Sequence, residues 1–241
     1  MADRLIKIGH RGAAGYEPEN TLVSFQKAIE LGADMIELDV HVCKSGELVV
    51  IHDDTLERTT NGKGKVSDMA LAELKELYAG KGQRIPTLDE VLDLVDRRVR
   101  INIELKGKKT ALPVAQTVML RTEEGWEQNH FLVSSSDYDE LRRFRIFDPF
   151  SRIGLIIGKL PGALHRLNLF DPFRLALELK CYSMHPRVNF AGRRFIETAH
   201  RSGLKVFPWT INSPAEARRL GKLGVDGIFS DYPDRLIFSE A

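Results

Sequence analysis

The chain has 241 residues, which suits one sizeable core and lies close to the roughly 250 residues usual for a single (β/α)₈ barrel. Hydrophobic residues make up 43% and charged residues 29% of the chain, a composition typical of a soluble globular protein. The 35 basic and 34 acidic residues nearly cancel, so the charge gives no indication of a nucleic-acid partner or a basic membrane-binding patch.

The N-terminal stretch, MADRLIKIGHRG, has no apolar segment followed by a small-residue cleavage site, so no secretory signal is predicted. No run of the sequence reaches the roughly 18 apolar residues of a membrane span. Cys43 and Cys181 both lie in apolar, strand-like surroundings, which is typical of buried thiols and not of a disulfide scaffold. We therefore expect a cytoplasmic protein without a membrane span.

Short β-rich segments alternate with longer helical patterns along the whole chain. The predicted strands cover residues 5–9, 35–42, 48–52, 100–105, 131–134, 152–157, 181–185, 205–209 and 227–230. Strand–helix alternation of this kind predicts a parallel sheet covered by helices.

Three helix starts are visible in the sequence. Asn20 is a predicted N-cap, with Gly32 just beyond the end of the same helix. Thr87 and Glu90 fit a capping box. Ser213-Pro214 opens another helix, with proline at its first position.

Nine strands are one too many for an eight-stranded barrel. Only residues 44–47 separate the second and third strands, and a parallel crossover needs about a dozen residues or more, so this pair must be an antiparallel hairpin. Residues 53 to about 85 then form an insertion with one short helix near 69–78. The sequence thus predicts one (β/α)₈ TIM-barrel domain over residues 1–241, with a small insertion after the second strand.

Two strands carry acidic residues on one face. Apolar and polar side chains alternate along 35–42, so Glu37 and Asp39 point the same way. Residues 100–106 repeat the pattern and place Glu104 on the polar face. If the apolar faces meet the helices, these carboxylates point into the barrel, where packed apolar side chains are the norm.

Glu37, Asp39 and Glu104 are therefore candidate metal ligands. Burial and mutual repulsion would raise their pKa values unless a cation lay between them. A set of oxygen ligands suits one divalent cation, Mg²⁺ or Ca²⁺. The alternative is that each carboxylate pairs with a lysine or arginine across the barrel.

Two histidines belong beside this acidic group. His10 ends the first strand, and active sites in this fold lie at the C-terminal ends of the strands. If Cys43 pairs with Leu48 in the hairpin, Asp39 lies opposite His52. Either histidine alone is compatible with a structural role, but two beside an acidic cluster are candidates for general acid and base.

Three more residues lie at the same predicted mouth. Arg11 follows His10 and Lys106 follows Glu104; both are suited to a phosphate, although either could simply neutralise the carboxylates. Trp209 ends the strand at 205–209 and is either a core aromatic or a wall of the substrate pocket.

The order and spacing of several short motifs are more specific than any one of them. Over roughly residues 5 to 237 the chain resembles the glycerophosphodiester phosphodiesterase family, through the runs His10-Arg11-Gly12, Pro18-Glu19-Asn20-Thr21, Glu37-Leu38-Asp39-Val40, His52-Asp53, Arg58-Thr59-Thr60, Pro86-Thr87-Leu88, Glu104-Leu105-Lys106, Trp209-Thr210-Ile211-Asn212 and Gly224-Val225-Asp226-Gly227. Residues 111–193 match only loosely.

The resemblance implies a (β/α)₈ barrel with an insertion, and it implies a role for each candidate residue. These roles are metal ligation by Glu37, Asp39 and Glu104, acid/base catalysis by His10 and His52, phosphate binding by Arg11 and Lys106, and a place near the substrate for Trp209. The implied reaction is metal-dependent hydrolysis of a small-molecule glycerophosphodiester to glycerol 3-phosphate and an alcohol.

Two rival functions stay open at this point. A lysophospholipase D would need an apolar channel, and the stretch 153–173 is rich in Leu, Ile and Phe. A non-catalytic phosphodiester-binding protein would be expected to lack one of the histidines or acids, and this chain has all five. The head group, the metal, the division of roles between the histidines, a cyclic phosphate intermediate and the oligomeric state are all left open.

Overall fold

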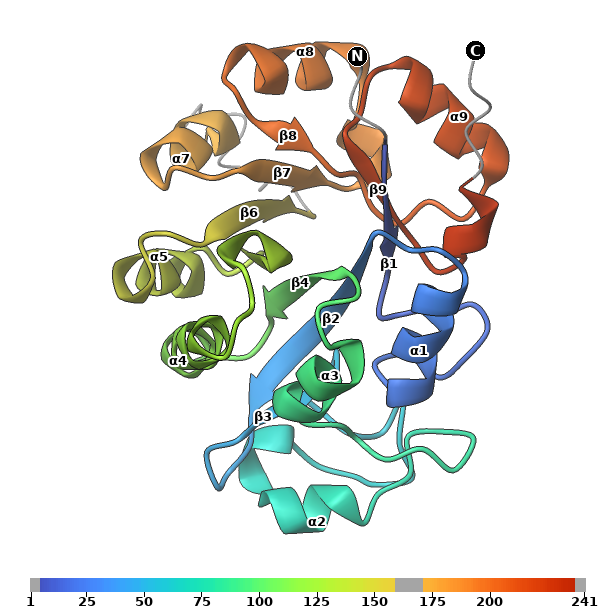
Figure 1. Ribbon diagram of the computed structural model, residues 1–241, viewed down its shortest axis with the longest axis vertical. Helices are drawn as coiled ribbons and strands as arrows, with labels where there is room; N and C mark the ends of the chain where they lie inside the picture. Colours follow the sequence, from blue (N-terminus) through green and yellow to red (C-terminus); the bar gives the residue numbers. More distant parts are fainter. Residues whose placement is uncertain (1–4, 159–170, 237–241) are drawn as a thin grey trace.

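The structure, a computed structural model, describes residues 5–158 and 171–236. Eight parallel strands form a nearly closed barrel with helices outside it, as Figure 1 shows, so the predicted TIM barrel is confirmed. Around the barrel the strands follow the order β8 (Lys205–Val206), β7 (Ser183–Pro186), β6 (Arg152–Ile157), β5 (Phe131–Ser135), β4 (Arg100–Leu105), β2 (Met35–Val42), β1 (Ile6–Gly9) and β9 (Gly227–Ser230).

Two backbone hydrogen bonds link the segments around β8 and β9, the two ends of this strand order, although the strands themselves are not paired. The amide of Asp226 donates to the Val206 carbonyl at 3.0 Å, and the amide of Phe229 donates to the Pro208 carbonyl at 3.1 Å. The strand predicted over 205–209 is too long, because regular pairing ends at Val206, two residues before a proline that has no N–H to donate. Likewise β7 begins at Ser183, two residues after the predicted start.

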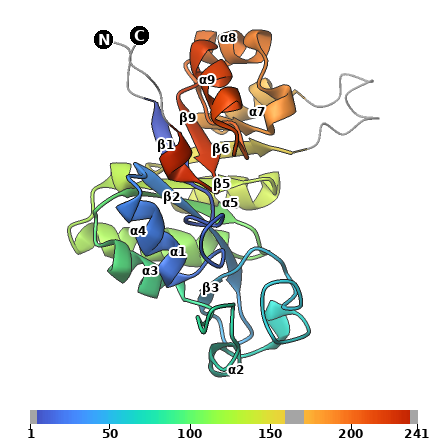
Figure 2. The same cartoon turned by 90° about the vertical axis from the view of Figure 1, so that its right-hand side faces the viewer.

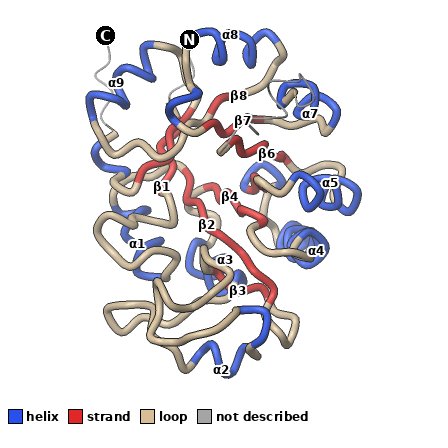
Figure 3. Tube along the Cα trace, turned by 180° about the vertical axis from the view of Figure 1, so that it is seen from behind, coloured by secondary structure: helices blue, strands red, loops and turns tan. Residues whose placement is uncertain are grey.

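The helices cover the outside of the barrel, as Figure 3 shows from behind. They are α1 (Leu22–Glu30), α3 (Leu88–Val95), α4 (Ala111–Glu123), α5 (Tyr138–Phe147), α7 (Pro172–Glu178), α8 (Arg193–Arg201) and α9 (Pro214–Lys222). No described helix is long and apolar enough to cross a membrane.

The alternation predicted for the acidic strands is confirmed by the packing. Ile36 and Leu38 of β2 and Ile101 and Ile103 of β4 are fully buried in the cluster that the helices complete. A separate apolar cluster fills the barrel interior, made of Ile8, Met35, Leu132, Phe207 and Phe229. The acidic residues of the same strands therefore point away from the helix layer.

Two of the three predicted helix starts are confirmed. Thr87 accepts a hydrogen bond from the Glu90 amide at 3.2 Å, and the Glu90 carboxylate accepts one from the Thr87 amide at 2.8 Å. Helix α9 starts at Pro214. The prediction for Asn20 is wrong, because Thr21 caps α1 while Asn20 adopts a left-handed backbone and donates its side-chain amide to Asp39 at 2.9 Å.

Residues 51–87, between β3 (Leu48–Val50) and α3, form a separate lobe beside the barrel, which we call the insertion (Figure 2). It contains η1 (Val66–Asp68) and α2 (Leu71–Lys75), the latter shorter than the helix predicted near 69–78. Apolar side chains that include Ile51, Leu56, Val66 and Leu74 give it a cluster of its own.

The hairpin between β2 and β3 is antiparallel as predicted, but its register differs by one residue. Leu48 pairs with Val42 and not with Cys43, because the Cys43 amide donates to the Glu47 carbonyl at 3.0 Å and leaves a three-residue turn. Gly46, with φ +106°, allows that tight turn. Ile51 consequently hydrogen-bonds opposite Asp39, and His52 lies one residue beyond.

Both cysteines are buried and unpaired, as the sequence predicts. Burial raises the pKa of the Cys181 thiol to about 12. Such a thiol is not a reactive nucleophile.

Gly12 tests how tightly the segment after β1 packs, and Gly32, just after α1, serves as its control. A Cβ on Gly12 would lie 2.6 Å from the Ser24 backbone, whereas a Cβ on Gly32 would meet nothing within 4 Å. Both glycines have positive φ, so backbone strain in each alanine variant should lower the free energy of unfolding by about 1 kcal/mol. Gly12→Ala should lose a further ~1–3 kcal/mol through overpacking. Urea unfolding of both variants in EDTA measures the difference, and equal losses would contradict the close approach.

Candidate active site

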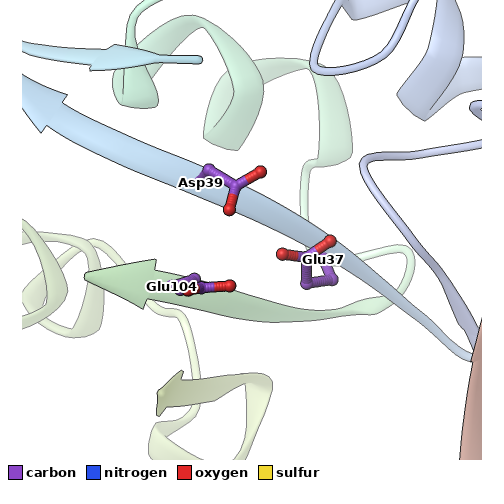
Figure 4. A group of neighbouring side chains, drawn as sticks. All are labelled: Glu37, Asp39 and Glu104. Carbon is purple, nitrogen blue, oxygen red and sulfur yellow. The ribbon is translucent and has the colours of Figure 1, made fainter. Parts of the chain in front are cut away.

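Three carboxylates from two neighbouring strands converge inside the barrel. Glu37 and Asp39 come from β2 and Glu104 from β4, with Asp39 and Glu104 directly paired in the register. Figure 4 shows the three side chains turned toward one another between the strands. One oxygen of each lies within 4.8 Å of the others, and all three residues are buried.

Their proton affinities reflect this crowding. Burial, together with the charges of Asp39 and Glu104, raises the pKa of Glu37 well above its usual value. Burial and Asp39 raise the pKa of Glu104 to about 7, although Lys106 opposes the shift. Burial also opposes ionisation of Asp39, but the cations of Arg11 and Lys106 outweigh it and keep its pKa low.

Two cations border the carboxylates, as predicted. Lys106 Nζ lies 2.9 Å from Glu104 Oε1 and 3.8 Å from Asp39 Oδ1. The Arg11 amide donates to Glu37 at 2.8 Å, and its guanidinium Nε lies 3.5 Å from Asp39. The sequence left open that each carboxylate pairs with a lysine or arginine, and the structure shows part of that pairing, through Arg11 and Lys106.

That pairing does not satisfy the whole cluster. Asp39 Oδ1 is buried and accepts no hydrogen bond from any described residue. An unsatisfied carboxylate oxygen beside two further carboxylates, with no nitrogen or sulfur ligand among the three, suits a hard divalent cation such as Mg²⁺ or Ca²⁺. The donor set therefore fits the predicted metal.

His10 lies at the C-terminal end of the barrel, just after β1. Its Nδ1 is 2.7 Å from Asp231 Oδ1, beyond the end of β9. Asn212 donates to the other Asp231 oxygen at 2.6 Å. Burial opposes ionisation of Asp231, but its hydrogen bonds with His10 and Asn212 keep its pKa low. The carboxylate engages Nδ1 of the ring and leaves Nε2 for proton transfer.

His52 has a carboxylate partner of its own. Its Nδ1 lies 2.5 Å from Asp53 Oδ1, and Arg58 donates to the other Asp53 oxygen at 2.5 Å. Arg58 also bonds Glu19, which accepts from Arg11 at 2.8 Å. Burial, with Arg11 and Lys106, lowers the pKa of His52, although Asp39 opposes the shift.

Several residues of this network were not among the sequence candidates. Asp231 and Asp53 hold the two histidines, and Asn20 holds Asp39. Asp53 directly follows His52, and Asp231 directly follows β9. The position of each carboxylate just after a strand is the sequence feature that could have identified it as a site residue. His41 is buried next to His52, and His41 Nε2 lies 3.1 Å from the backbone carbonyl oxygen of His52.

Trp209 is half-buried and lies between the apolar cluster inside the barrel and an open cavity. Its Nε1 donates to the His185 carbonyl at 2.8 Å, and its ring packs against the apolar cluster inside the barrel. It also lines a cavity of about 630 Å³ together with Tyr138 and Arg187. Its ring therefore belongs both to the packed interior and to the wall of that cavity.

The chain is similar to known proteins over nearly its whole length. The glycerophosphoryl diester phosphodiesterase family matches residues 10–235. A glycerophosphodiester phosphodiesterase from Caldanaerobacter subterraneus is 38% identical over 243 residues, with 97% of each chain covered. A human lysophospholipase D is 28% identical over 264 residues, which cover 95% of this chain and 84% of that protein.

The fold is likewise similar to solved structures. An Oleispira antarctica phosphodiesterase in complex with the product sn-glycerol-3-phosphate superposes with a TM-score of 0.83. The two chains are 31% identical, and 95% of this chain and 94% of that one are covered.

The raised pKa of Glu104 predicts a pH dependence of stability in the absence of metal. With a folded pKa of about 7 against the usual 4.5, the folded protein keeps a proton that the unfolded chain has lost. This contribution to stability is complete below pH 4.5 and disappears as the pH rises through about 7. In EDTA, the wild type should therefore lose stability over this range relative to Glu104→Gln, whose amide cannot ionise.

Urea unfolding of both proteins at several pH values measures this difference. Glu30→Gln, an exposed change on α1, serves as a control and should follow the wild type. Parallel curves for the wild type and Glu104→Gln would contradict the raised pKa.

Proposed function

The chain belongs to the glycerophosphoryl diester phosphodiesterase family, and from that premise we propose that it hydrolyses glycerophosphodiesters to glycerol 3-phosphate and an alcohol. The observation that carries the proposal is the buried group of Glu37, Asp39 and Glu104 with Arg11 and Lys106 beside it. The product seen in the related phosphodiesterase supports the same substrate class.

We propose that Glu37, Asp39 and Glu104 hold one Mg²⁺ or Ca²⁺. When bound, such a cation supplies Lewis-acid stabilisation of the charge that develops on the phosphate. Arg11 and Lys106 add two positive charges at the same place, one as a planar donor fork and one as a compact ammonium.

His10 and His52 are the proposed acid/base pair. One removes the proton from the attacking hydroxyl, and the other donates a proton to the alkoxide that leaves when the P–O bond breaks. Asp231 and Asp53 each hold an Nδ1 and so orient the other ring nitrogen toward the substrate. Water and the glycerol 2-hydroxyl are both candidate nucleophiles, the second giving a cyclic phosphate that water then opens. Trp209 is proposed to contact the bound substrate.

Neither rival function is favoured by a described feature. The apolar stretch 153–173, on which a lysophospholipase D reading depends, lies outside the described residues between 159 and 170. A mere binding protein would have no use for two histidines with carboxylate partners. The single catalytic domain over 1–241 with its insertion at about 53–85, and the cytoplasmic location, stay predictions.

Removal of divalent cations should abolish hydrolysis of glycerophosphocholine, because Arg11 and Lys106 then offset only part of the charge of the three carboxylates, which repel the anionic substrate. The measurement is turnover after exhaustive chelation, with residual metal determined by elemental analysis. Mg²⁺ and Ca²⁺ are then added back separately. Full activity in metal-free enzyme would contradict the proposal.

Each histidine should contribute the ~10²–10⁴-fold typical of a general acid or base. Loss of the acid matters most when the leaving alcohol is poor, so bis(p-nitrophenyl) phosphate should partly rescue either His10→Ala or His52→Ala, and not both. The comparison with glycerophosphocholine assigns the two roles. If both variants keep most of their activity on glycerophosphocholine, acid/base catalysis by this pair is wrong.

A further inference from the structure

A large cavity adjoins the proposed active site on the side of His52. Its volume is about 1020 Å³, and its walls come from the β2–β3 hairpin, the insertion and the loop after β4. His52 and Lys106 both line it, so the cavity opens onto the proposed reaction centre. His10 and Trp209 are not among its lining residues.

This cavity, which we call the lysine cavity, has an excess of positive charge. Lys106 is paired with Glu104, and Lys108 with Asp137. The other three lysines of the wall form no ion pair with any described residue; they are Lys44, Lys65 and Lys109. The wall has two acids, and one of them, Asp53, is already bonded to His52 and Arg58.

Backbone contacts fix two of these lysines at the rim. The Lys44 amide donates to the Met69 carbonyl at 2.9 Å, which ties the hairpin turn to the insertion. Lys65 is held in an antiparallel bridge with Thr55. Lys44 therefore lies on a turn that contacts the insertion, and Lys65 lies within the insertion itself.

The third lysine depends on a close approach of the loop after β4. The Gly107 amide donates to the Val40 carbonyl at 3.1 Å, and a Cβ at this position would lie 2.8 Å from His41 Nδ1. Only glycine lets the loop pass this close to β2 without displacing His41. Lys109 follows two residues later on the cavity wall.

We propose that the lysine cavity receives the alcohol portion of the substrate, and that the enzyme prefers glycerophosphodiesters whose alcohol carries a further phosphate group. The inference rests on the proposed function. Three unpaired cations on three separate segments attract an anion from several directions, whereas the quaternary ammonium of choline is repelled. The cavity at Trp209 then receives the uncharged glycerol.

Two substrates that differ by a single phosphate test the preference. These are glycerophosphoinositol and glycerophosphoinositol 4-phosphate, compared by kcat/KM at low salt with the metal-loaded enzyme. We expect about a tenfold preference for the phosphorylated substrate, the size that a few exposed charge pairs supply together. In the triple variant Lys44→Gln/Lys65→Gln/Lys109→Gln, this ratio should fall to near one, because kcat/KM for the phosphorylated substrate falls by more than kcat/KM for glycerophosphoinositol.

A matched triple variant removes the same charge elsewhere. Lys27→Gln/Lys180→Gln/Lys222→Gln changes lysines outside the cavity wall and should keep the wild-type ratio. A wild-type ratio of one would overturn the proposal, as would an equal loss for both substrates in the first triple variant, since that indicates general steering of anions. If Arg187→Gln abolishes the preference and the lysine triple variant does not, the alcohol lies in the Trp209 cavity and the proposal is wrong.

A binding measurement separates this inference from the proposed function. Calorimetry with myo-inositol 4-phosphate alone should detect binding to the wild type, and binding at least several-fold weaker to the first triple variant. If no glycerophosphodiester is hydrolysed with any divalent cation, the proposed function fails, and the calorimetry still decides the charge preference of the cavity. Equal binding by both proteins would overturn the inference.

Discussion

The burial of three carboxylates in one barrel interior is the constraint on which the site depends. Glu37, Asp39 and Glu104 lie within 4.8 Å of one another where water cannot solvate them freely. Like charges at this distance are tolerated only with compensation, which Arg11 and Lys106 supply in part. The remaining oxygen of Asp39 has no hydrogen bond from the described residues, and this deficit is what a bound cation would remove.

The apolar side chains that stabilise the barrel and the carboxylates that repel one another occupy different parts of it. Apolar side chains such as Phe207 and Phe229 fill one part of the interior, and the helix-facing residues of β2 and β4 anchor the strands from outside. The carboxylates occupy the inner face of those same two strands, so well-packed apolar residues hold them in place. A rigid scaffold of this kind keeps repelling groups together that would otherwise move apart.

The alternation of apolar and acidic residues made the core of the site predictable from sequence. Glu37 and Asp39 had to share a face, and the length of the hairpin loop required β3 to be antiparallel. The one-residue register error arose because the turn at Gly46 depends on a positive φ that the loop length does not reveal. Asn20 was assigned to a cap because its contact with Asp39 joins residues 19 positions apart, which no local pattern reports.

The two histidines are held in unequal ways, although each has a carboxylate at Nδ1. Asp231 is fixed by Asn212, a neutral partner, close to the last strand. Asp53 is fixed by Arg58, whose other bonds reach Glu19 and through it the guanidinium of Arg11. The side-chain hydrogen bonds that hold His52 therefore lead to a residue proposed to bind phosphate, whereas those described for His10 lead to Asp231 and from it to Asn212. Because Arg58 and Asp53 both belong to the insertion, this lobe contributes to the site by positioning His52 and by forming one wall of the lysine cavity.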